Sequence, residues 1–389
     1  MTQTLLLPGE ATLGVLGGGQ LGRMFLASAH ALGYRTVVLD PDPHSPAGLI
    51  AHAHLQADYL DAAALDRLAA SCQAVTTEFE NVPAAALERL AAHLAVAPAG
   101  AAVAICQDRA REKAHFEASG VACAPHAVIA READLAGVPD TLLPGILKTA
   151  RLGYDGKGQV RVATRAELAA AWQRLGRVDC VLEALLPLAL ECSVIVARNA
   201  AGEVVEFPVQ QNLHRDGILA VTEVPAPALS AAQQAEAAAA AARIAASMNY
   251  VGVLCVEFFL LADGRLVVNE MAPRPHNSGH YTLDACDVSQ FELQVRAMAG
   301  LPLRTPRLHS PVVMLNLLGD LWFDAAGAER APDWAAVLAL PGTHLHLYGK
   351  TSARPGRKMG HLNVTAASAD EAGALARRAA QILGLPGDW

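Results

Sequence analysis

A short turn sequence between two strand-forming runs constrains this chain more than any other feature. Asp263 and Gly264 separate the run 256–261 from the run 266–270, and both runs are rich in Val, Leu or Phe. An Asp-Gly pair in this setting predicts a β-hairpin with a two-residue type I′ turn. Counting outward from that turn predicts these cross-strand pairs: Ala262 with Arg265, Leu260 with Val267, Phe258 with Asn269, and Glu257 with Glu270.

The last pair would place two carboxylates side by side on one face of the hairpin. Directly opposed like charges destabilise a sheet, and at about 5 Å with an effective dielectric constant near 20 the repulsion is roughly 3 kcal/mol. A bound cation would relieve it, and Mg²⁺ usually takes carboxylates together with nucleotide phosphates. We therefore predict that Glu257 and Glu270 hold Mg²⁺. The alternative is a solvated hairpin with two exposed glutamates.

The segment 271–280 follows directly and brings a cation, an imidazole and an amide close to the predicted metal. These side chains belong to Arg274, His276 and Asn277. Two prolines in the segment prevent a regular helix or a central strand. A rigid polar segment beside a cation is typical of an anion-binding site.

Composition excludes several classes of function. The chain has 389 residues, which suggests two or three domains, and 53% are hydrophobic. A net charge of −8 argues against a nucleic-acid or anionic-membrane surface. Seven cysteines without CxxC spacing indicate neither a zinc site nor a disulfide framework. No signal-like start and no run of about 20 apolar residues occur. We expect a cytoplasmic protein without nucleic-acid or membrane partners.

The first hundred residues alternate apolar runs with alanine-rich stretches, which predicts βαβ units and a mostly parallel sheet. The elements expected along the chain are strands at 13–16, 36–39, 74–77, 146–149, 160–162, 312–317 and 343–348, and helices at 20–32, from Pro83, at 108–119, from Ser230 to near Asn249, and at 370–383. We predict an α/β fold, α+β in parts. Its domains would span 1–104 (Rossmann-like), 105–303 (with a lid at about 120–185) and 304–389.

A glycine-rich turn follows the first expected strand. Gly17, Gly19 and Gly22 match the dinucleotide fingerprint GxGxxG, and Asp40 ends the next strand. A dehydrogenase is one interpretation of this motif. The motif alone is weak evidence, because any glycine-containing helix N-terminus can bind a single phosphate.

A second glycine-rich segment, 153–158, follows Lys148 at the end of a strand. Its spacing does not fit the Walker A pattern, so phosphate binding here would come from a lid whose backbone amides fold over the nucleotide. By composition alone a surface hairpin tip is the alternative. The nearby run 181–186 with Glu191 is either an adenine hinge with an acid for the ribose hydroxyls or a buried strand with surface charge, and both interpretations stay open.

The segment 350–361 concentrates positive charge in an otherwise acidic chain. Its basic or imidazole side chains are Lys350, Arg354, Arg357, Lys358 and His361. A solvated loop is one interpretation. The local charge reversal favours a clamp for a phosphate or carboxylate.

Taken in order, these motifs resemble a known enzyme family. The blocks that carry the resemblance are 17–24 (GGGQLGRM), 77–82 (TEFENV), the Lys148 strand with 153–159, 211–214 (QNLH), 269–280 (NEMAPRPHNSGH), and 348–350 with 357–361. The chain closely resembles the 5-(carboxyamino)imidazole ribonucleotide synthases, which have the ATP-grasp fold. The resemblance covers nearly the whole chain and implies ATP, Mg²⁺, 5-aminoimidazole ribonucleotide and bicarbonate as ligands, and a homodimer.

The resemblance also implies roles for individual residues. The ATP contacts would be Arg109, Lys148, Gly153, Tyr154, Asp155, Gly156, Lys157, Gly158, Gln159, Glu183, Ala184, Leu185, Leu186, Glu191, His214, Asn269 and Glu270. The ribonucleotide contacts would be Gln20, Leu21, Glu78, Tyr154, Asp155, Lys157, Asn277, Lys350 and Arg357. Arg274 and His276 would hold bicarbonate and carboxyphosphate, and with Lys350 they are the expected catalytic residues. Leu152 stands where the family often has glycine, which bears on the lid's flexibility.

Other classes of protein would behave differently. A nicotinamide dehydrogenase would bind NAD(P)H, and an idle binding or assembly protein would not turn over ATP. Among ligases, a formate-dependent glycinamide ribonucleotide transformylase and a biotin carboxylase are the nearest competitors. The segments 271–280 and 350–361 favour the imidazole substrate.

Overall fold

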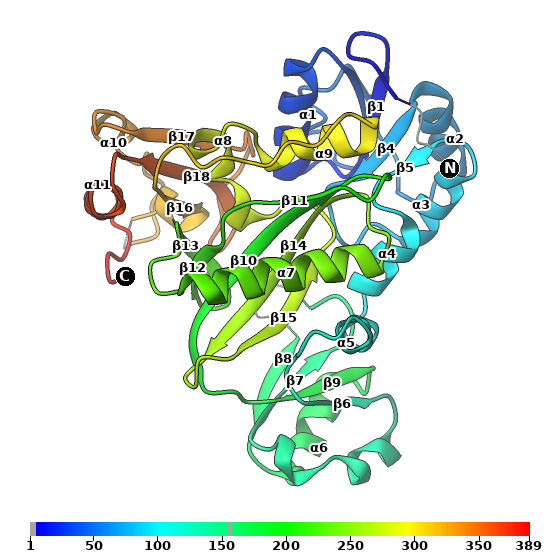
Figure 1. Cartoon of the computed structure of the whole chain (residues 1–389), viewed down its shortest axis with the longest axis vertical. Helices are drawn as coiled ribbons and strands as arrows, with labels where there is room; N and C mark the ends of the chain where they lie inside the picture. The colour runs from blue at the N-terminus through cyan, green and yellow to red at the C-terminus, as the bar shows by residue number, and fades with distance from the viewer. Residues whose placement is uncertain (1–4, 154–157, 325) are drawn as a thin grey trace.

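The computed structural model describes residues 5–153, 158–324 and 326–389. Over these residues the strands form three sheets. Figure 1 shows the N-terminal sheet at the upper right, a long central sheet, and a small sheet that projects at the bottom. The predicted mixed α/β class is confirmed.

The N-terminal sheet is parallel, with strand order β3-β2-β1-β4-β5, as the alternating pattern predicts. Its elements are β1 (Thr12–Leu16), α1 (Gln20–Ala31), β2 (Arg35–Leu39), β3 (Ala53–Leu55), α2 (Ala62–Ser71), β4 (Ala74–Thr77), α3 (Ala84–Ala91), β5 (Ala95–Val96) and α4 (Gly100–Cys106). The strands and helix predicted at 13–16, 20–32, 36–39 and 74–77 agree with these bounds to within one residue.

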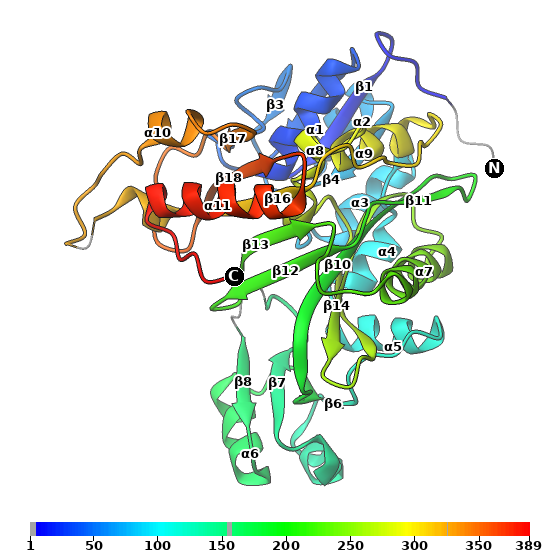
Figure 2. The ribbon, with the colours of Figure 1, turned by 60° about the vertical axis from the view of Figure 1, so that its left-hand side comes forward.

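The small sheet is antiparallel, with order β6-β9-β7-β8, and lies within the residues 120–185 that were predicted to form a lid, which stays a prediction. Its elements are β6 (His126–Ile129), η1 (Glu132–Gly137), η2 (Asp140–Leu142), β7 (Gly145–Thr149), β8 (Gln159–Val162), α6 (Arg165–Arg174) and β9 (Cys180–Ala184). Figure 2 shows this sheet projecting from the rest of the molecule.

The central sheet runs in the order β15-β14-β10-β12-β13-β16-β18-β17, and β11 pairs with β10. The elements of its first part are α5 (Arg109–Ala118), β10 (Leu188–Arg198), β11 (Val204–Glu206), β12 (Gln210–Arg215), β13 (Ile218–Val224), α7 (Ala231–Ser247), β14 (Gly252–Leu261), β15 (Leu266–Ala272), η3 (Asn277–Gly279), α8 (Thr282–Ala285) and α9 (Gln290–Ala299). Helix α7 begins with a capping box, since Ser230 and Gln233 bond reciprocally.

The C-terminal strands extend this same sheet, because β13 pairs with β16. The C-terminal elements are β16 (Val312–Leu318), η4 (Gly319–Trp322), α10 (Trp334–Leu338), β17 (Thr343–Leu347), β18 (Lys358–Thr365) and α11 (Ala369–Leu383). Lys358 and His361 lie on strand β18, so the predicted basic loop ends earlier than expected. The domain boundaries stay a prediction. Helix α9, inside the predicted middle domain, packs into the N-terminal core through Phe291 and Val295.

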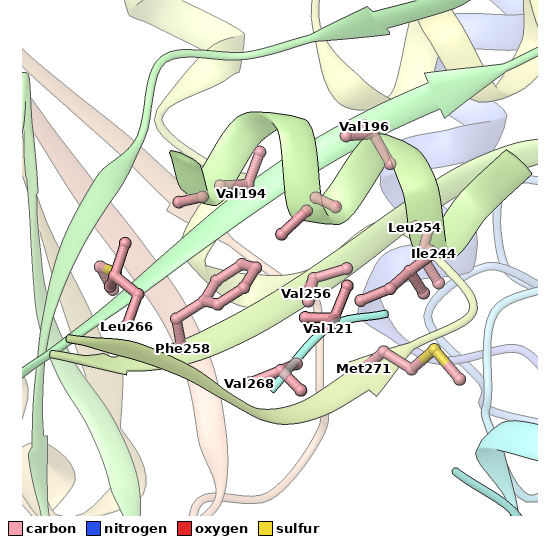
Figure 3. Packing of buried hydrophobic residues seen from close by; sticks show 14 of the residues in the cluster. Val121, Val194, Val196, Ile244, Leu254, Val256, Phe258, Leu266, Val268 and Met271 are labelled. Carbon is pink, nitrogen blue, oxygen red and sulfur yellow. The ribbon is translucent and has the colours of Figure 1, made fainter. Parts of the chain in front are cut away.

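The hydrophobic core under the hairpin lies between the central sheet and helix α7. Figure 3 shows Phe258 and Val256 of β14 and Val194 of β10 packed on the α7 side of the sheet, near Ile244. Phe258 is only 2% exposed. Even-numbered side chains of β14 therefore face this core, and Glu257 faces the other side.

The hairpin turn is one residue longer than predicted. The Leu261 amide donates to the Arg265 carbonyl at 2.9 Å, so the connection consists of residues 262–264. Gly264 adopts φ +86°, as expected for a three-residue hairpin loop that ends in a left-handed residue. The pairs nearest the turn are accordingly Leu260 with Leu266, Phe259 with Val267 and Phe258 with Val268, not the predicted ones.

A β-bulge then restores the predicted pair of Glu257 and Glu270. The extra residue on β15 is Asn269. Val268 faces the core under α7, and Met271, three residues later, faces it again. A strand without a bulge alternates strictly, which would point Glu270 into the same core as Val268. The bulge is therefore what brings Glu270 to the polar side.

No helix in the described part of the chain has the length and apolar character needed to cross a membrane.

Candidate active site

A cavity of about 510 Å³ lies where the lid sheet, the hairpin β14–β15 and the segment after β15 meet. Most of the predicted ATP contacts line it. The lining residues predicted as catalytic, ATP, substrate or metal contacts are Arg109, Lys148, Gly153, Gln159, Glu183, Ala184, Leu185, Leu186, Glu191, His214, Glu257, Asn269, Glu270, Arg274, His276 and Asn277. Sequence segments more than 150 residues apart thus form one site.

The two hairpin glutamates differ in their surroundings. The Glu257 side chain is 13% exposed, and burial, followed by the charge of Glu270, raises the pKa of Glu257 to about 7. Burial also acts to raise the pKa of Glu270, but Arg109, whose Nη1 lies 2.9 Å from Glu270 Oε2, and Lys148 hold it below its usual value. The predicted carboxylate pair therefore exists, with one member poorly compensated.

Two groupings of potential metal-binding atoms occur among the described residues. One joins Glu257 to His276 and Cys255. Burial raises the pKa of the Cys255 thiol well above its usual value, so this thiol is a poor ligand. The other grouping contains Glu117, Cys123 and His126 and includes none of the predicted site residues.

His214 bridges two acids on the wall of the cavity. It forms an ion pair with Glu191, and its Nε2 lies 4.0 Å from Glu257 Oε2. Burial lowers the pKa of His214, but Glu191 and Glu257 outweigh burial and raise it overall. The imidazole thus carries positive charge more readily than a free histidine.

The predicted phosphate lysine is held by a buried acid. Lys148 Nζ lies 2.9 Å from Glu183 Oε2, and the Glu183 side chain is 4% exposed. Burial acts to raise the pKa of Glu183, but Lys148 and Lys113 lower it overall. The surface-charge interpretation of Glu183 is therefore wrong. Glu191, on β10, keeps 27% of its side-chain surface exposed.

The segment after β15 contains a defined histidine tautomer. The Ser278 amide donates to His276 Nδ1 at 3.3 Å, so Nδ1 is an acceptor and the proton lies on Nε2. His276 Nε2 is 3.2 Å from Glu257 Oε1. Burial, then the charge of Arg274, lowers the pKa of His276 well below its usual value. His276 is therefore a neutral donor facing the carboxylate pair.

Two asparagines around the cavity have buried polar atoms without a hydrogen-bond partner among the described residues. A nearby arginine has a charged partner. Asn277 is 7% exposed, and neither its amide oxygen nor its amide nitrogen has a partner among the described residues. The Asn269 Oδ1 atom is likewise buried without a partner there. Arg274 forms an ion pair with Glu80. Buried polar atoms without partners are rare in folded proteins and are expected where a ligand binds.

The glycine turn of the N-terminal sheet is filled by protein carboxylates. Glu78 accepts hydrogen bonds from the amides of Gly19 (2.8 Å) and Gly22 (3.1 Å), and Asp40 accepts one from Gly18 (2.6 Å). A Cβ on Gly19 would lie 2.7 Å from Glu78 Oε1. These glycines make room for a carboxylate, so the motif does not form the dinucleotide site that the dehydrogenase interpretation requires.

The remaining predicted ribonucleotide contacts lie outside the lining of this cavity. Gln20 and Leu21 begin α1, and Leu21 is buried in the N-terminal core. Lys350 Nζ donates to the Lys358 carbonyl at 2.6 Å, and Arg357 Nη1 donates to the Ser352 carbonyl at 2.7 Å. Burial, then Arg357, lowers the pKa of Lys350 to about 8.

Some predicted contacts lie outside the described residues: Tyr154, Asp155, Gly156 and Lys157. Gly158 is described but does not line the cavity. Conversely, Glu80 and Glu112 line the cavity and were missed as site residues. Lys358, predicted only as part of the basic clamp at 350–361, lines it too. Glu80 belongs to the block 77–82, which was the available signal. Glu112 lies on an evidently charged helix, where nothing in the sequence separates buried from exposed acids.

Three family models match the chain in order. The ribonucleotide synthetase preATP-grasp domain matches residues 10–107, the ATP-grasp domain matches 114–291, and the phosphoribosylaminoimidazole carboxylase C-terminal domain matches 312–375. The ATP-grasp match covers the small sheet and strands β10 to β15, and the C-terminal match covers strands β16 to β18 of the central sheet.

Proteins of known name are similar to this chain over nearly its full length. An N5-carboxyaminoimidazole ribonucleotide synthase of Brucella melitensis is 46% identical over 93% of this chain and 98% of its own. A crystal structure of an N5-carboxyaminoimidazole ribonucleotide synthetase with ADP has a TM-score of 0.90 and 38% identity, covering 98% of this chain and 99% of that one. The Aspergillus clavatus synthase, in complex with ADP and 5-aminoimidazole ribonucleotide, has a TM-score of 0.87 and 33% identity, covering 97% and 99%. The chain belongs to the N5-carboxyaminoimidazole ribonucleotide synthase family of ATP-grasp ligases.

Proposed function

We propose that this chain carboxylates 5-aminoimidazole ribonucleotide with bicarbonate and ATP, giving 5-(carboxyamino)imidazole ribonucleotide, ADP and phosphate in purine biosynthesis. The observation that carries the proposal is the meeting of Glu257, Glu270 and Lys148 with Arg274 and His276 around one cavity. This arrangement offers a metal and phosphate site directly beside an anion site. The relative with bound ADP and aminoimidazole ribonucleotide supports the same pair of ligands.

The donor set fits magnesium. Glu257 and Glu270 are cross-strand neighbours, and Asn269 Oδ1 next to them is buried without a partner among the described residues. Hard oxygen donors of this kind suit Mg²⁺. When bound, the ion would neutralise negative charge that develops on the phosphates during transfer. Glu257 and Glu270 would hold it.

The chain's own cations would orient the nucleotide. Lys148 and Arg109 both line the cavity and would contact the phosphates of ATP. A bicarbonate oxygen would attack the γ-phosphorus, the bond to the β-phosphate oxygen would break, and ADP would leave. The product of that step is carboxyphosphate, a far better electrophile than bicarbonate. Lid residues around Gly153 would exclude water from it.

Arg274 and His276 would orient the activated carboxyl group toward the substrate amine. The amine nitrogen would attack the carboxyl carbon, or carbon dioxide released from carboxyphosphate, and the leaving phosphate would take up the amine proton. His276 presents an N–H at Nε2 and uses Nδ1 as an acceptor for the Ser278 amide. It is therefore set to donate a hydrogen bond and not to accept a proton. An unchanged pH–rate profile in His276→Asn would agree with this orienting role, and loss of one ionisation from the profile would contradict it.

The ribonucleotide would bind between the N-terminal and C-terminal elements. Gln20 and Glu78 lie at the carboxyl edge of the parallel sheet, where such sheets bind ligands. Lys350 and Arg357 would contact its phosphate, and Asn277 would offer its unpartnered amide.

ADP release tests the proposal directly. Turnover should require aminoimidazole ribonucleotide and bicarbonate together. ADP release with glycinamide ribonucleotide and formate, or with biotin, would instead assign the chain to another ATP-grasp reaction. NAD(P)H binding in a fluorescence titration would support a dehydrogenase, and no ADP under any combination would support a binding protein.

We also propose a cytoplasmic homodimer. Light scattering after size-exclusion chromatography checks the assembly, with twice the chain mass expected and a single chain mass contradicting it.

A further inference from the structure

Helix α5 buries two charged side chains to which the proposed function assigns no role. Glu112 is 2% exposed and Lys113 is 0% exposed. Burial of an unpaired charge is strongly unfavourable. The partners of these side chains therefore indicate what the helix does.

Lys113 contacts both the strand that carries Glu270 and the acid that pairs with Lys148. Its Nζ donates to the Asn269 carbonyl at 2.9 Å and lies 3.2 Å from Glu183 Oε1. Asn269 is the bulge residue directly before Glu270. The other oxygen of Glu183 is 2.9 Å from Lys148 Nζ. One buried ammonium thus contacts both the strand of a metal-site glutamate and the acid that holds the phosphate lysine.

Two neighbours of Lys113 on α5 bind the same short stretch of β15. Arg109 pairs with the Glu270 carboxylate, and Glu112 Oε1 accepts the Met271 amide at 2.7 Å. Residues at i, i+3 and i+4 lie on one face of a helix. β15 is an edge strand of the central sheet, so Lys113 and Glu112 satisfy backbone groups that a neighbouring strand would otherwise bond.

Two lysines, 113 and 148, share the carboxylate of Glu183. The wider cluster also contains Arg109, Glu112 and Glu270. Lys113 has no exposed side-chain surface, whereas Lys148 is 11% exposed and lines the cavity. Of the two ammonium groups on Glu183, only that of Lys148 can therefore reach an anion in the cavity.

We propose that Lys113 is a positioning residue for ATP. It shares the carboxylate of Glu183, so that Lys148 keeps positive charge for the phosphates, and it fixes the backbone that carries Glu270. The inference rests on the proposed function in one respect, namely that Lys148 contacts phosphate. Without Lys113, Glu183 and Lys148 would form a closed neutral pair.

ADP and adenosine binding to the full-length chain separate this role from a merely structural one. Lys113→Met should weaken ADP binding about tenfold, equivalent to about 1.4 kcal/mol, and leave adenosine binding unchanged because adenosine has no phosphates. Arg111→Met removes an exposed charge from the same helix and should change neither affinity. Equal loss for both ligands in Lys113→Met, or loss for neither, would overturn the proposal. If Lys148→Met binds ADP as tightly as the parent chain, the proposed contact between Lys148 and phosphate is wrong, whatever the result for Lys113→Met.

A double-mutant cycle tests the sharing of Glu183 and remains informative if Lys113→Met does not fold. In the Glu183→Gln background, Lys148 has no carboxylate partner, so adding Lys113→Met should change ADP affinity less than twofold. Thermal unfolding checks that both background variants are folded. A further tenfold loss in that background would show that Lys113 acts independently of Glu183 and would overturn the proposal.

Discussion

Two pairs of carboxylates, in different sheets, are satisfied in different ways. Asp40 and Glu78 follow the ends of parallel strands and accept backbone amides of the glycine turn, Gly18, Gly19 and Gly22. Glu257 and Glu270 face each other across an antiparallel hairpin, and the pKa of Glu257 is raised to about 7 by burial and by its neighbour.

The difference teaches where a ligand can bind. The first pair occupies the backbone amides of Gly18, Gly19 and Gly22, although burial still raises the pKa of Glu78. The second pair depends on side chains, and Glu257 stays poorly compensated. Only in the second pair do the two carboxylates face each other across a hairpin, which is where a cation would compensate them. Carboxylates therefore fill the glycine turn in the first case and offer a metal-binding site in the second.

The largest effect should follow removal of charge from the second pair. Glu270→Gln should lower kcat by about 10² to 10³, because a group that stabilises the developing phosphate charge is lost. Steady-state ADP release measures it. Asp263→Asn, an acid-to-amide change at the exposed hairpin tip, is the matched control and should keep full activity. Full activity in Glu270→Gln would remove the metal assignment.

The free energy of unfolding should respond in the opposite order, with a loss at the first pair and none at the second. Asp40→Asn replaces an acceptor of the Gly18 amide and the Tyr59 hydroxyl and should lower the free energy of unfolding by about 1–3 kcal/mol. Glu257→Gln removes a buried charge next to Glu270 and should cost nothing in magnesium-free buffer. Urea denaturation compares them. Equal losses in both variants would mean that the pairs are equally compensated.

The half-buried cation Lys350 offers a pH test of the same principle. The pKa of Lys350 is lowered to about 8, first by burial and then by Arg357. The folded state thus releases this proton before the unfolded state does, so the group's contribution to stability rises with pH between about 8 and 10.5. Phosphate affinity moves the other way.

The KM for the ribonucleotide should therefore rise above pH 8, by up to about tenfold per pH unit. Lys350→Arg keeps its charge and should show no such rise. A rise that persists in that variant would assign the ionisation to another group.

The smallest effect concerns the lid. Leu152 has φ +59° and is 74% exposed, a left-handed conformation that costs a non-glycine residue roughly 1–2 kcal/mol. Leu152→Gly should change the KM for ATP less than about threefold and raise the melting temperature slightly. Leu152→Ala keeps the strain and serves as the control. A lower melting temperature in Leu152→Gly alone would show that the leucine side chain, and not its backbone, matters.

Local pattern was enough to predict much of the fold. Strands β1, β2 and β4 and helices α1 and α7 follow from periodicity, caps and apolar runs. The bulge at Asn269 was not predictable, because it depends on which side chains the core under α7 accepts. The predicted turn was one residue too short, and the bulge was not predicted. These two errors cancelled, so the pair of Glu257 and Glu270 was predicted correctly, although the pairs between the bulge and the turn were not.

The candidate site was predictable where one segment carries the chemistry. The segment 271–280 and the hairpin are of this kind. Lys113 and Glu112 could not be found in this way, because their role arises from burial between α5, β9 and β15, which are far apart in sequence. The glycine turn misled for the same reason. The carboxylate that fills it, Glu78, comes from another strand.

Calorimetric titration of ADP with and without Mg²⁺ tests the central claim most directly. In the parent chain Mg²⁺ should tighten ADP binding at least about tenfold. In Glu270→Gln that gain should disappear while metal-free ADP binding stays within about twofold of the parent. A full Mg²⁺-dependent gain in Glu270→Gln would contradict the claim that the hairpin pair holds the metal.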